Sequence, residues 1–216
     1  MKRNLTSLLV VGFLLGLQVQ TADAQVGRGA FGFGVSVDGN MLQSDWKTND
    51  PGIGASADIS YSFGNNWGLL SRLGIDTYYG MNTANQSVNS TSFRGDLSLS
   101  YDFLRSKPLN PFVFVGAGFV FYAPRISDGP ALTSGKYKQW DMALNGGIGF
   151  DYYIDESWSV ILAGEATLMG NDQLDGYKAG GSNDMIGRVS VGIRYYLFDR
   201  STVEKIVKVV EKRFQE

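Results

Sequence analysis

Charged side chains recur at alternate positions of segments whose other positions are apolar. In residues 186–198, for example, Arg188 and Arg194 stand on the polar side of such a segment. With the same period of two, the following charged residues share that side: Asp38, Asp58, Arg72, Asp76, Arg94, Asp96, Asp102, Asp141, Asp151, Glu165, Arg188 and Arg194. Acids and bases on one face could act as acid–base pairs in catalysis, or could form ion pairs that hold a structure together.

The composition narrows this chemistry. The chain has no histidine and no cysteine, which excludes histidine triads, thiolate catalysis and disulfides. Residues 27–32 match the glycine spacing of a dinucleotide loop, but a strand pattern follows where a helix is required. Residues 170–176 are acidic but lack the spacing of a calcium-binding EF-hand loop. We therefore expect no cofactor, no metal and no catalytic residue, and the net charge of −2 gives no indication of nucleic-acid binding.

Eight segments carry the alternation, and each is about ten residues or longer, which is the length that a tilted strand needs to cross a bilayer. They are residues 31–41, 53–63, 67–79, 93–103, 112–122, 140–152, 158–168 and 186–198. One apolar and one polar face are typical of a strand between lipid and a lumen. The fifth segment is apolar on both faces, so its orientation stays open.

The connections between these segments alternate in length. Residues 64–66, 104–110 and 155–157 predict tight turns, and residues 43–51, 80–91, 123–138 and 170–185 predict long polar loops. Short periplasmic turns and long external loops are typical of outer-membrane barrels. Aromatic residues also cluster in two bands, which predicts interfacial girdles. The band near the loops comprises Tyr78, Tyr79, Phe93, Phe121, Tyr122 and Trp140, and the band near the turns comprises Tyr61, Phe63, Trp67, Tyr101, Phe103, Tyr152, Trp158 and Tyr195.

We therefore predict an all-β fold, an eight-stranded antiparallel transmembrane barrel of up-and-down topology. A lumen formed by eight strands is just wide enough for side chains to fill it. Charges there must pair to offset their desolvation. We interpret them as a structural network that plugs the lumen, with a gated narrow pore and catalysis by a carboxylate pair as alternatives. The network is expected to comprise Asp58, Arg72, Asp76, Arg94, Asp96, Asp102, Glu165, Arg188 and Arg194.

The two ends of the chain predict separate segments. Residues 1–24 have a positive start, a short apolar core and the sequence Ala22-Asp23-Ala24, which is typical of a cleaved secretory signal peptide. The barrel then occupies residues 25–198. In residues 199–216, a capping-box pattern at Ser201 precedes apolar residues at helical spacing, which predicts a short amphipathic periplasmic helix.

The last strand carries a more specific pattern. Its apolar residues Val189, Val191, Ile193, Tyr195 and Leu197 stand two apart, and the aromatic residue Phe198 follows directly. With this strand the chain resembles the OmpA-like and OmpX-like superfamily of eight-stranded outer-membrane barrels. The resemblance implies that these residues form the signal read by the barrel-assembly machinery. Since eighteen residues follow residue 198 in this sequence, we do not expect the peptidoglycan binding of the two-domain members to apply.

These patterns lead to an expectation about function. We expect a monomeric integral protein of a Gram-negative-type outer membrane, in contact with outer-membrane lipid and not an enzyme. Its role would be structural or surface-interacting, through envelope integrity, adhesion or a surface ligand bound by the external loops. The alternative is a narrow pore or transport barrel for small or apolar molecules.

Overall fold

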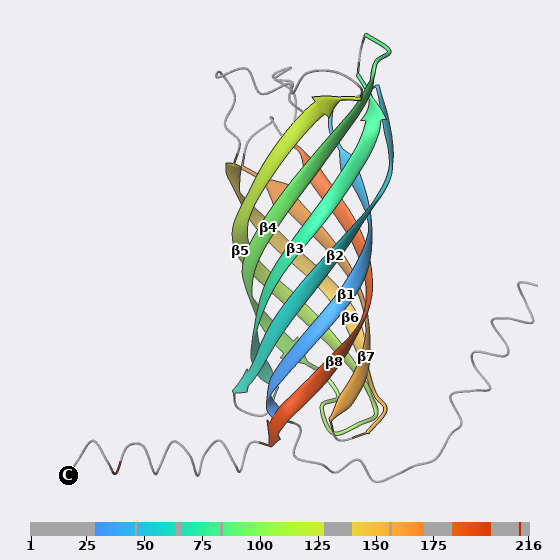
Figure 1. Cartoon of the computed structure of the whole chain (residues 1–216). Coiled ribbons are helices and arrows are strands. Elements are labelled where there is room, and N and C mark those ends of the chain that lie inside the picture. The colour runs from blue at the N-terminus through green and yellow to red at the C-terminus, as the bar shows by residue number, and fades with distance from the viewer. Residues whose placement is uncertain are drawn as a thin grey trace, which may run out of the picture.

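The computed structural model of the protein describes residues 29–45, 47–63, 66–82, 84–127, 140–155, 157–170 and 183–199, and residue 212. These residues form eight antiparallel strands in a closed barrel, in which each strand pairs with the next and the last pairs with the first (Figure 1). The predicted eight-stranded up-and-down barrel is confirmed. The strands are β1 (Gly29–Gln43), β2 (Thr48–Phe63), β3 (Trp67–Met81), β4 (Ser87–Asp102), β5 (Leu109–Ile126), β6 (Trp140–Tyr153), β7 (Trp158–Met169) and β8 (Met185–Asp199).

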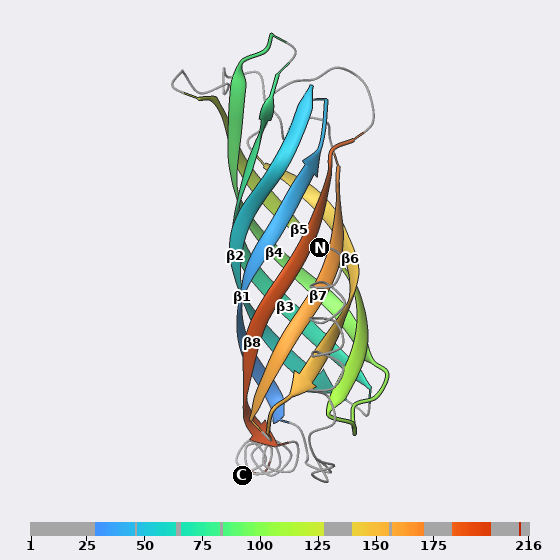
Figure 2. The ribbon, with the colours of Figure 1, turned by 90° about the vertical axis from the view of Figure 1, so that its right-hand side faces the viewer.

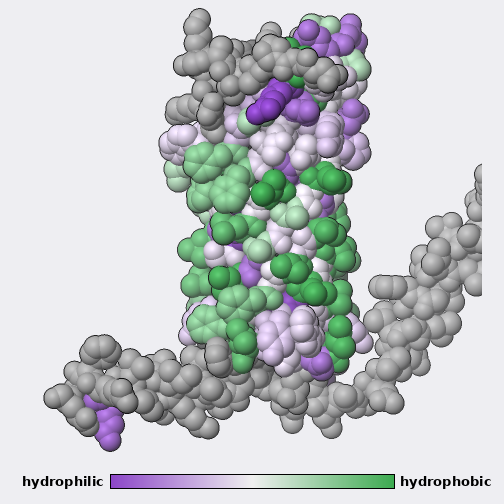
Figure 3. Space-filling view, in the orientation of Figure 1, coloured by the Kyte–Doolittle hydropathy of each residue, from purple (hydrophilic) through white to green (hydrophobic). Residues whose placement is uncertain are grey.

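The register of the barrel follows the alternation in the sequence. On β3, for instance, Leu73 and Ile75 are exposed on the outer surface, whereas Arg72 and Asp76 on either side of this pair are buried inside. The outer surface therefore carries a broad apolar band around the middle of the barrel, and hydrophilic side chains gather at one rim (Figure 3). An apolar belt of this kind is what hydrocarbon requires of a barrel that crosses a bilayer.

The two ends of the barrel differ. We call the end at which β1 begins and β8 ends the turn end, and it carries the connections 64–66, 103–108 and 154–157 (Figure 2). The opposite end, the loop end, carries residues 44–47, 82–86, 127–139 and 170–184. The turns are short as predicted.

Two of the predicted long loops are in fact short, because the strands continue into them. β2 already begins at Thr48, and β4 begins at Ser87, opposite Met81 of β3. β5 continues to Ile126, opposite Val88. Beyond the apolar belt a strand lies in water on its outer face, so polar residues continue the pairing there without any apolar alternation.

The structure also settles the orientation of β5, whose two faces are both apolar. Phe112 and Phe114 point inward and are buried, whereas Phe119 and Phe121 are exposed outside. Two aromatic residues were wrongly assigned to the girdle near the loops. Tyr78 and Tyr122 occupy inward positions and are buried in the lumen.

The predicted signal peptide and the predicted C-terminal helix lie outside the described residues. Within the described part of the chain, no helix is long and apolar enough to cross a membrane.

Candidate functional site

Asp76 of β3 lies at the centre of the buried charges. Its Oδ2 atom accepts hydrogen bonds from Arg94 Nε and from Arg188 Nε, each at 3.1 Å. Its Oδ1 atom accepts one from Asn40 Nδ2 at 3.2 Å. One carboxylate thus joins four strands, β1, β3, β4 and β8.

The same arginines continue the network across the lumen. Arg94 also donates to Asp38 Oδ2 at 3.0 Å, and Arg188 donates to Glu165 Oε1 at 2.8 Å. Arg72 pairs with Asp96 at 3.0 Å and also forms an ion pair with Glu165. Because β3 and β7 are not neighbours in the barrel, the Arg72–Glu165 pair bridges opposite walls. We call this set the lumen network, and it consists of Asp38, Arg72, Asp76, Arg94, Asp96, Glu165 and Arg188.

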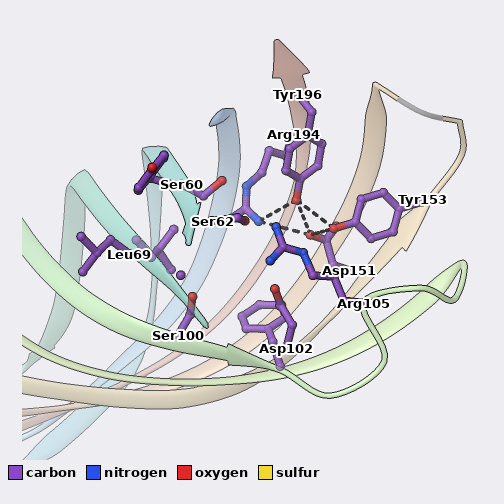
Figure 4. Close-up of a pocket in the computed structure, with 14 residues that line it drawn as sticks. Ser60, Ser62, Leu69, Ser100, Asp102, Arg105, Asp151, Tyr153, Arg194 and Tyr196 are labelled. Atoms are coloured by element: carbon purple, nitrogen blue, oxygen red, sulfur yellow. Dashed lines mark hydrogen bonds and ion pairs between the residues drawn. The ribbon is translucent and has the colours of Figure 1, made fainter. Parts of the chain in front are cut away.

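A second set of charges lies nearer the turn end, around Arg194 of β8. The guanidinium pairs with Asp58 at 2.8 Å and with Asp151 at 3.2 Å. Tyr196 donates its hydroxyl proton to Asp151 Oδ2 at 2.8 Å, and the hydroxyls of Tyr153 and Tyr196 are 3.1 Å apart (Figure 4). We call these five residues the Arg194 cluster.

The burial of these charged side chains indicates that they have a structural role. The four arginines of the two sets are only 3–9% exposed. A charge taken out of water is stable only when partners offset its desolvation, so each arginine depends on its carboxylates. These carboxylates are engaged by guanidinium groups, and within the described residues no group of three or more acidic side chains is arranged to hold a metal ion.

The structure places eight of the nine predicted network residues in these two sets. The ninth, Asp102, lies at the turn end of β4, where its Oδ1 atom accepts a hydrogen bond from Asn110 Nδ2 at 2.8 Å. Asp38 and Asp151 were recognised as inward-facing and belong to the sets as well. Asp141 is partly exposed near the start of β6.

Uncharged partners were not predicted. Asn145 donates to Ser98 Oγ at 2.9 Å, and the hydroxyl of Thr167 accepts from Arg188 at 2.7 Å. Tyr78 lies within hydrogen-bond distance of Asp76, Ser92 and Arg188. Their inward positions in the alternation are the signal in the sequence that could have indicated them.

A layer of apolar side chains across the lumen at the loop end was also missed. It is contributed by seven of the eight strands, all except β2, and its members are packed together and buried. We call it the apolar layer, and it consists of Leu42, Tyr78, Val88, Val120, Tyr122, Ala143, Met169 and Ile186. The lumen network lies next to it, because the hydroxyl of Tyr78 contacts Asp76.

A small cavity of about 30 Å³ lies at the turn end, against the Arg194 cluster (Figure 4). Serine hydroxyls, Asp102 and Arg105 line it. Two of the buried side-chain oxygens that have no hydrogen-bond partner among the described residues, Ser60 Oγ and Asp151 Oδ1, belong to residues that line this cavity. The turn end of the lumen therefore contains a polar cavity beside the buried cluster of Phe112, Phe114 and Ile161, whereas the apolar layer lies at the loop end.

Comparison with known families agrees with this architecture. A family model described as "Outer membrane protein beta-barrel domain" matches residues 7–198. The chain belongs to this family. Membership places this outer-membrane barrel in the outer membrane of Gram-negative bacteria, and the turn end therefore faces the periplasm. A search of curated protein sequences finds no match.

Solved structures share the fold of this outer-membrane barrel. Neisserial surface protein A (NspA) is 14% identical with a TM-score of 0.57, and the match covers 78% of this chain and 97% of that one. Ail of Yersinia pestis is 13% identical with a TM-score of 0.51, covering 78% and 98%. OprG of Pseudomonas aeruginosa is 13% identical with a TM-score of 0.52, covering 80% and 99%. Identities this low show the fold alone.

The predicted assembly residues of this outer-membrane barrel lie on the lipid-facing side of β8. The side chains of Val189, Val191, Ile193, Tyr195 and Leu197 are all exposed there. The backbone of Phe198 pairs with Phe31 of β1, which closes the barrel. The side chain of Phe198 lies outside the described residues, and the role of the set as an assembly signal stays a prediction.

Proposed function

We propose that the protein is a monomeric outer-membrane barrel with a structural or surface-interaction role, and that its lumen is closed to ions and solutes. One observation carries this proposal: paired charges join opposite walls of the lumen, and the apolar layer lies directly beside them. Eight strands leave an interior that side chains fill. An ion entering from outside would have to pass the eight packed side chains of the apolar layer to reach the lumen network, and apolar constrictions exclude water and ions by dewetting.

If the lumen is closed, the function of the protein must depend on its surface. The two longest connections of the barrel, residues 127–139 and 170–184, join strands that end at the loop end. Related folds support a surface role, since Ail is described as an attachment invasion locus protein and has been crystallised with a heparin analogue. We infer that these two segments carry binding to surfaces or envelope partners.

The proposal also includes two further points: the protein is not an enzyme, and it is exported and then inserted by the assembly machinery. The carboxylates of the lumen network are held by arginines, so they are poorly suited to accept or donate protons in a reaction. Residues 1–24 would direct export and be removed, and the lipid-facing residues of β8 would be read by the assembly machinery. Amino-terminal sequencing of protein from outer-membrane fractions should therefore begin at Gln25, whereas a start at Met1 would contradict the signal peptide.

Liposome swelling tests the closed lumen against the transport alternative. Protein refolded into vesicles should give no faster entry of small sugars or amino acids than vesicles without protein. Faster swelling that depends on solute size would favour the narrow pore instead.

Replacing residues 128–138 or 171–182 by short Gly-Ser linkers tests the surface role. These replacements should leave the rate of vesicle swelling unchanged but reduce the adhesion of whole cells to coated surfaces.

A further inference from the structure

The outer face of the barrel has a hollow of about 710 Å³ near the loop end, on β4 and β5. Three register pairs line it in order from the rim toward the middle of the barrel: Asn89 with Arg125, Thr91 with Ala123, and Phe93 with Phe121. Thr91 and Ala123 thus form the floor of the hollow. Phe93 and Phe121 form its lower wall, and Arg125 with Asn89 forms its upper wall.

The lower wall lies at the depth of the aromatic girdle. Phe93 and Phe121 are both nearly half exposed. Phe119 supports them, with ring centroids 6.3 Å from Phe93 and 5.4 Å from Phe121. Girdle aromatics mark the boundary between hydrocarbon and headgroups. An acyl chain lying against these rings would therefore have its headgroup at the level of the upper wall.

The upper wall presents the positive charge of Arg125. This residue follows Phe121 by four positions, about 13 Å along the strand. It is exposed, its register partner is Asn89 instead of an acid, and it makes no ion pair with any residue that the structure describes. A guanidinium binds phosphate through two parallel hydrogen bonds, and its aliphatic stem tolerates an apolar surrounding.

No described residue of β6 lines the hollow. The pairing of β5 with β6 ends at Phe121 opposite Trp140, whereas β5 continues to Ile126. Residues 122–126 of β5 pair with β4. Among the described residues, β5 therefore extends beyond the first residue of β6 at the level where the headgroup would lie.

We propose that this hollow binds a phosphate-bearing lipid of the outer leaflet, with an acyl chain against Phe93 and Phe121 and the phosphate at Arg125. The charge complementarity of Arg125, the depth of the two rings and the small side chains of Thr91 and Ala123 together define this occupant. The site lies on the lipid-facing surface, so it is independent of whether the lumen conducts.

Native mass spectrometry of the full barrel in dodecyl maltoside micelles tests the site, with dioleoyl phosphatidylglycerol as the anionic probe and dioleoyl phosphatidylcholine as the zwitterionic one. We expect one phosphatidylglycerol to bind in preference to phosphatidylcholine. Arg125→Ala should weaken phosphatidylglycerol binding by about tenfold, the loss of a charge-assisted pair. Ala123→Trp, which fills the floor and keeps the charge, should weaken it as well.

Two controls keep the test sharp. Lys47→Ala removes the same charge at the same end of the barrel, where Lys47 contacts Asn85, and should leave binding unchanged. Unboiled samples on an SDS gel verify that each variant is folded. Equal phosphatidylglycerol binding by the parent and by Arg125→Ala would overturn the proposal. So would competition by glycerol 3-phosphate as effective as that of the lipid, because the site would then recognise free phosphate.

Discussion

Each arginine of the lumen holds more than one carboxylate. Arg94 lies between Asp38, Asp76 and Asp96, with nitrogen–oxygen distances of 3.0, 3.1 and 3.4 Å. Asp76 in turn is shared with Arg188. Removing one partner from such a set leaves other charges buried without compensation, and this cost exceeds the net gain of forming the pair.

Arg94→Ala should therefore destabilise the folded barrel by about 3–5 kcal/mol. The free energy of unfolding, measured by urea titration in phosphatidylcholine vesicles, checks this value. The matched control is Arg125→Ala, the same truncation on the outer face, which should change stability by less than about 1 kcal/mol. Similar losses for both variants would show that Arg94 is not held by the lumen network.

A second prediction at the scale of single residues concerns a glycine of β6 that faces a phenylalanine ring of β5. A Cβ atom on Gly149 would lie 2.5 Å from Phe112 Cζ and 2.9 Å from the carbonyl oxygen of Leu162. A Cβ on Gly146, on the lipid side of the same strand, would meet nothing closer than 3.5 Å. Gly149→Ala should therefore cost about 1–3 kcal/mol through overpacking, whereas Gly146→Ala should be nearly neutral. Equal unfolding free energies for the two variants would mean that Phe112 moves aside freely.

At the scale of the strands, depth in the bilayer should decide the effect of a charge on the outer face. Val35 and Met41 of β1 are 57% and 52% exposed, and they are separated by about 20 Å along the strand. Val35→Arg puts a charge near the bilayer centre, with an expected cost of about 2–4 kcal/mol, whereas Met41→Arg near the interface should cost about 0–1 kcal/mol. The free energy of refolding in lipid vesicles measures the cost of each substitution. A larger cost for Met41→Arg would show that the bilayer centre does not lie near Val35.

The strands show how far the sequence could be read. Strict alternation, as in β4 with Leu97 and Leu99 outside and Arg94 and Asp96 inside, sets the register because a shift by one residue would turn every side chain to the other face. The same rule fails for β5, where both faces are apolar, and pairing with β4 decides its orientation.

The partners of each charge could not be predicted from the sequence. Alternation assigns Arg72 to the lumen, but its pairing with Glu165 of β7 depends on how the closed barrel brings opposite walls together. The apolar layer was missed for a different reason, because the alternation was not applied to the aromatic residues near the loops. Tyr78 and Tyr122 resemble girdle residues by their position near the loops, and only their inward direction distinguishes them.

At the scale of the whole molecule, the lumen has three successive levels. The apolar layer lies at the external end, the lumen network lies beside it, and the Arg194 cluster faces the polar cavity at the periplasmic end. If the lumen is closed as proposed, water from the periplasmic side should reach only as far as the Arg194 cluster.

Because the chain has no cysteine, single cysteines can map this access. Ser100→Cys at the turn-end cavity should react with a polar thiol reagent in the folded protein. Ser92→Cys, beside the apolar layer, should react only after unfolding, since Ser92 is 1% exposed. Mass spectrometry of the labelled protein reads out both sites, and rapid labelling of Ser92→Cys in the folded barrel would indicate a water-filled lumen.

Current recording in planar lipid bilayers tests the closed lumen most directly. If the lumen network and the apolar layer close the lumen as proposed, the refolded mature chain should show no steady conductance. A stable, ohmic and ion-selective current from the unmodified protein would contradict this account and would favour the narrow pore.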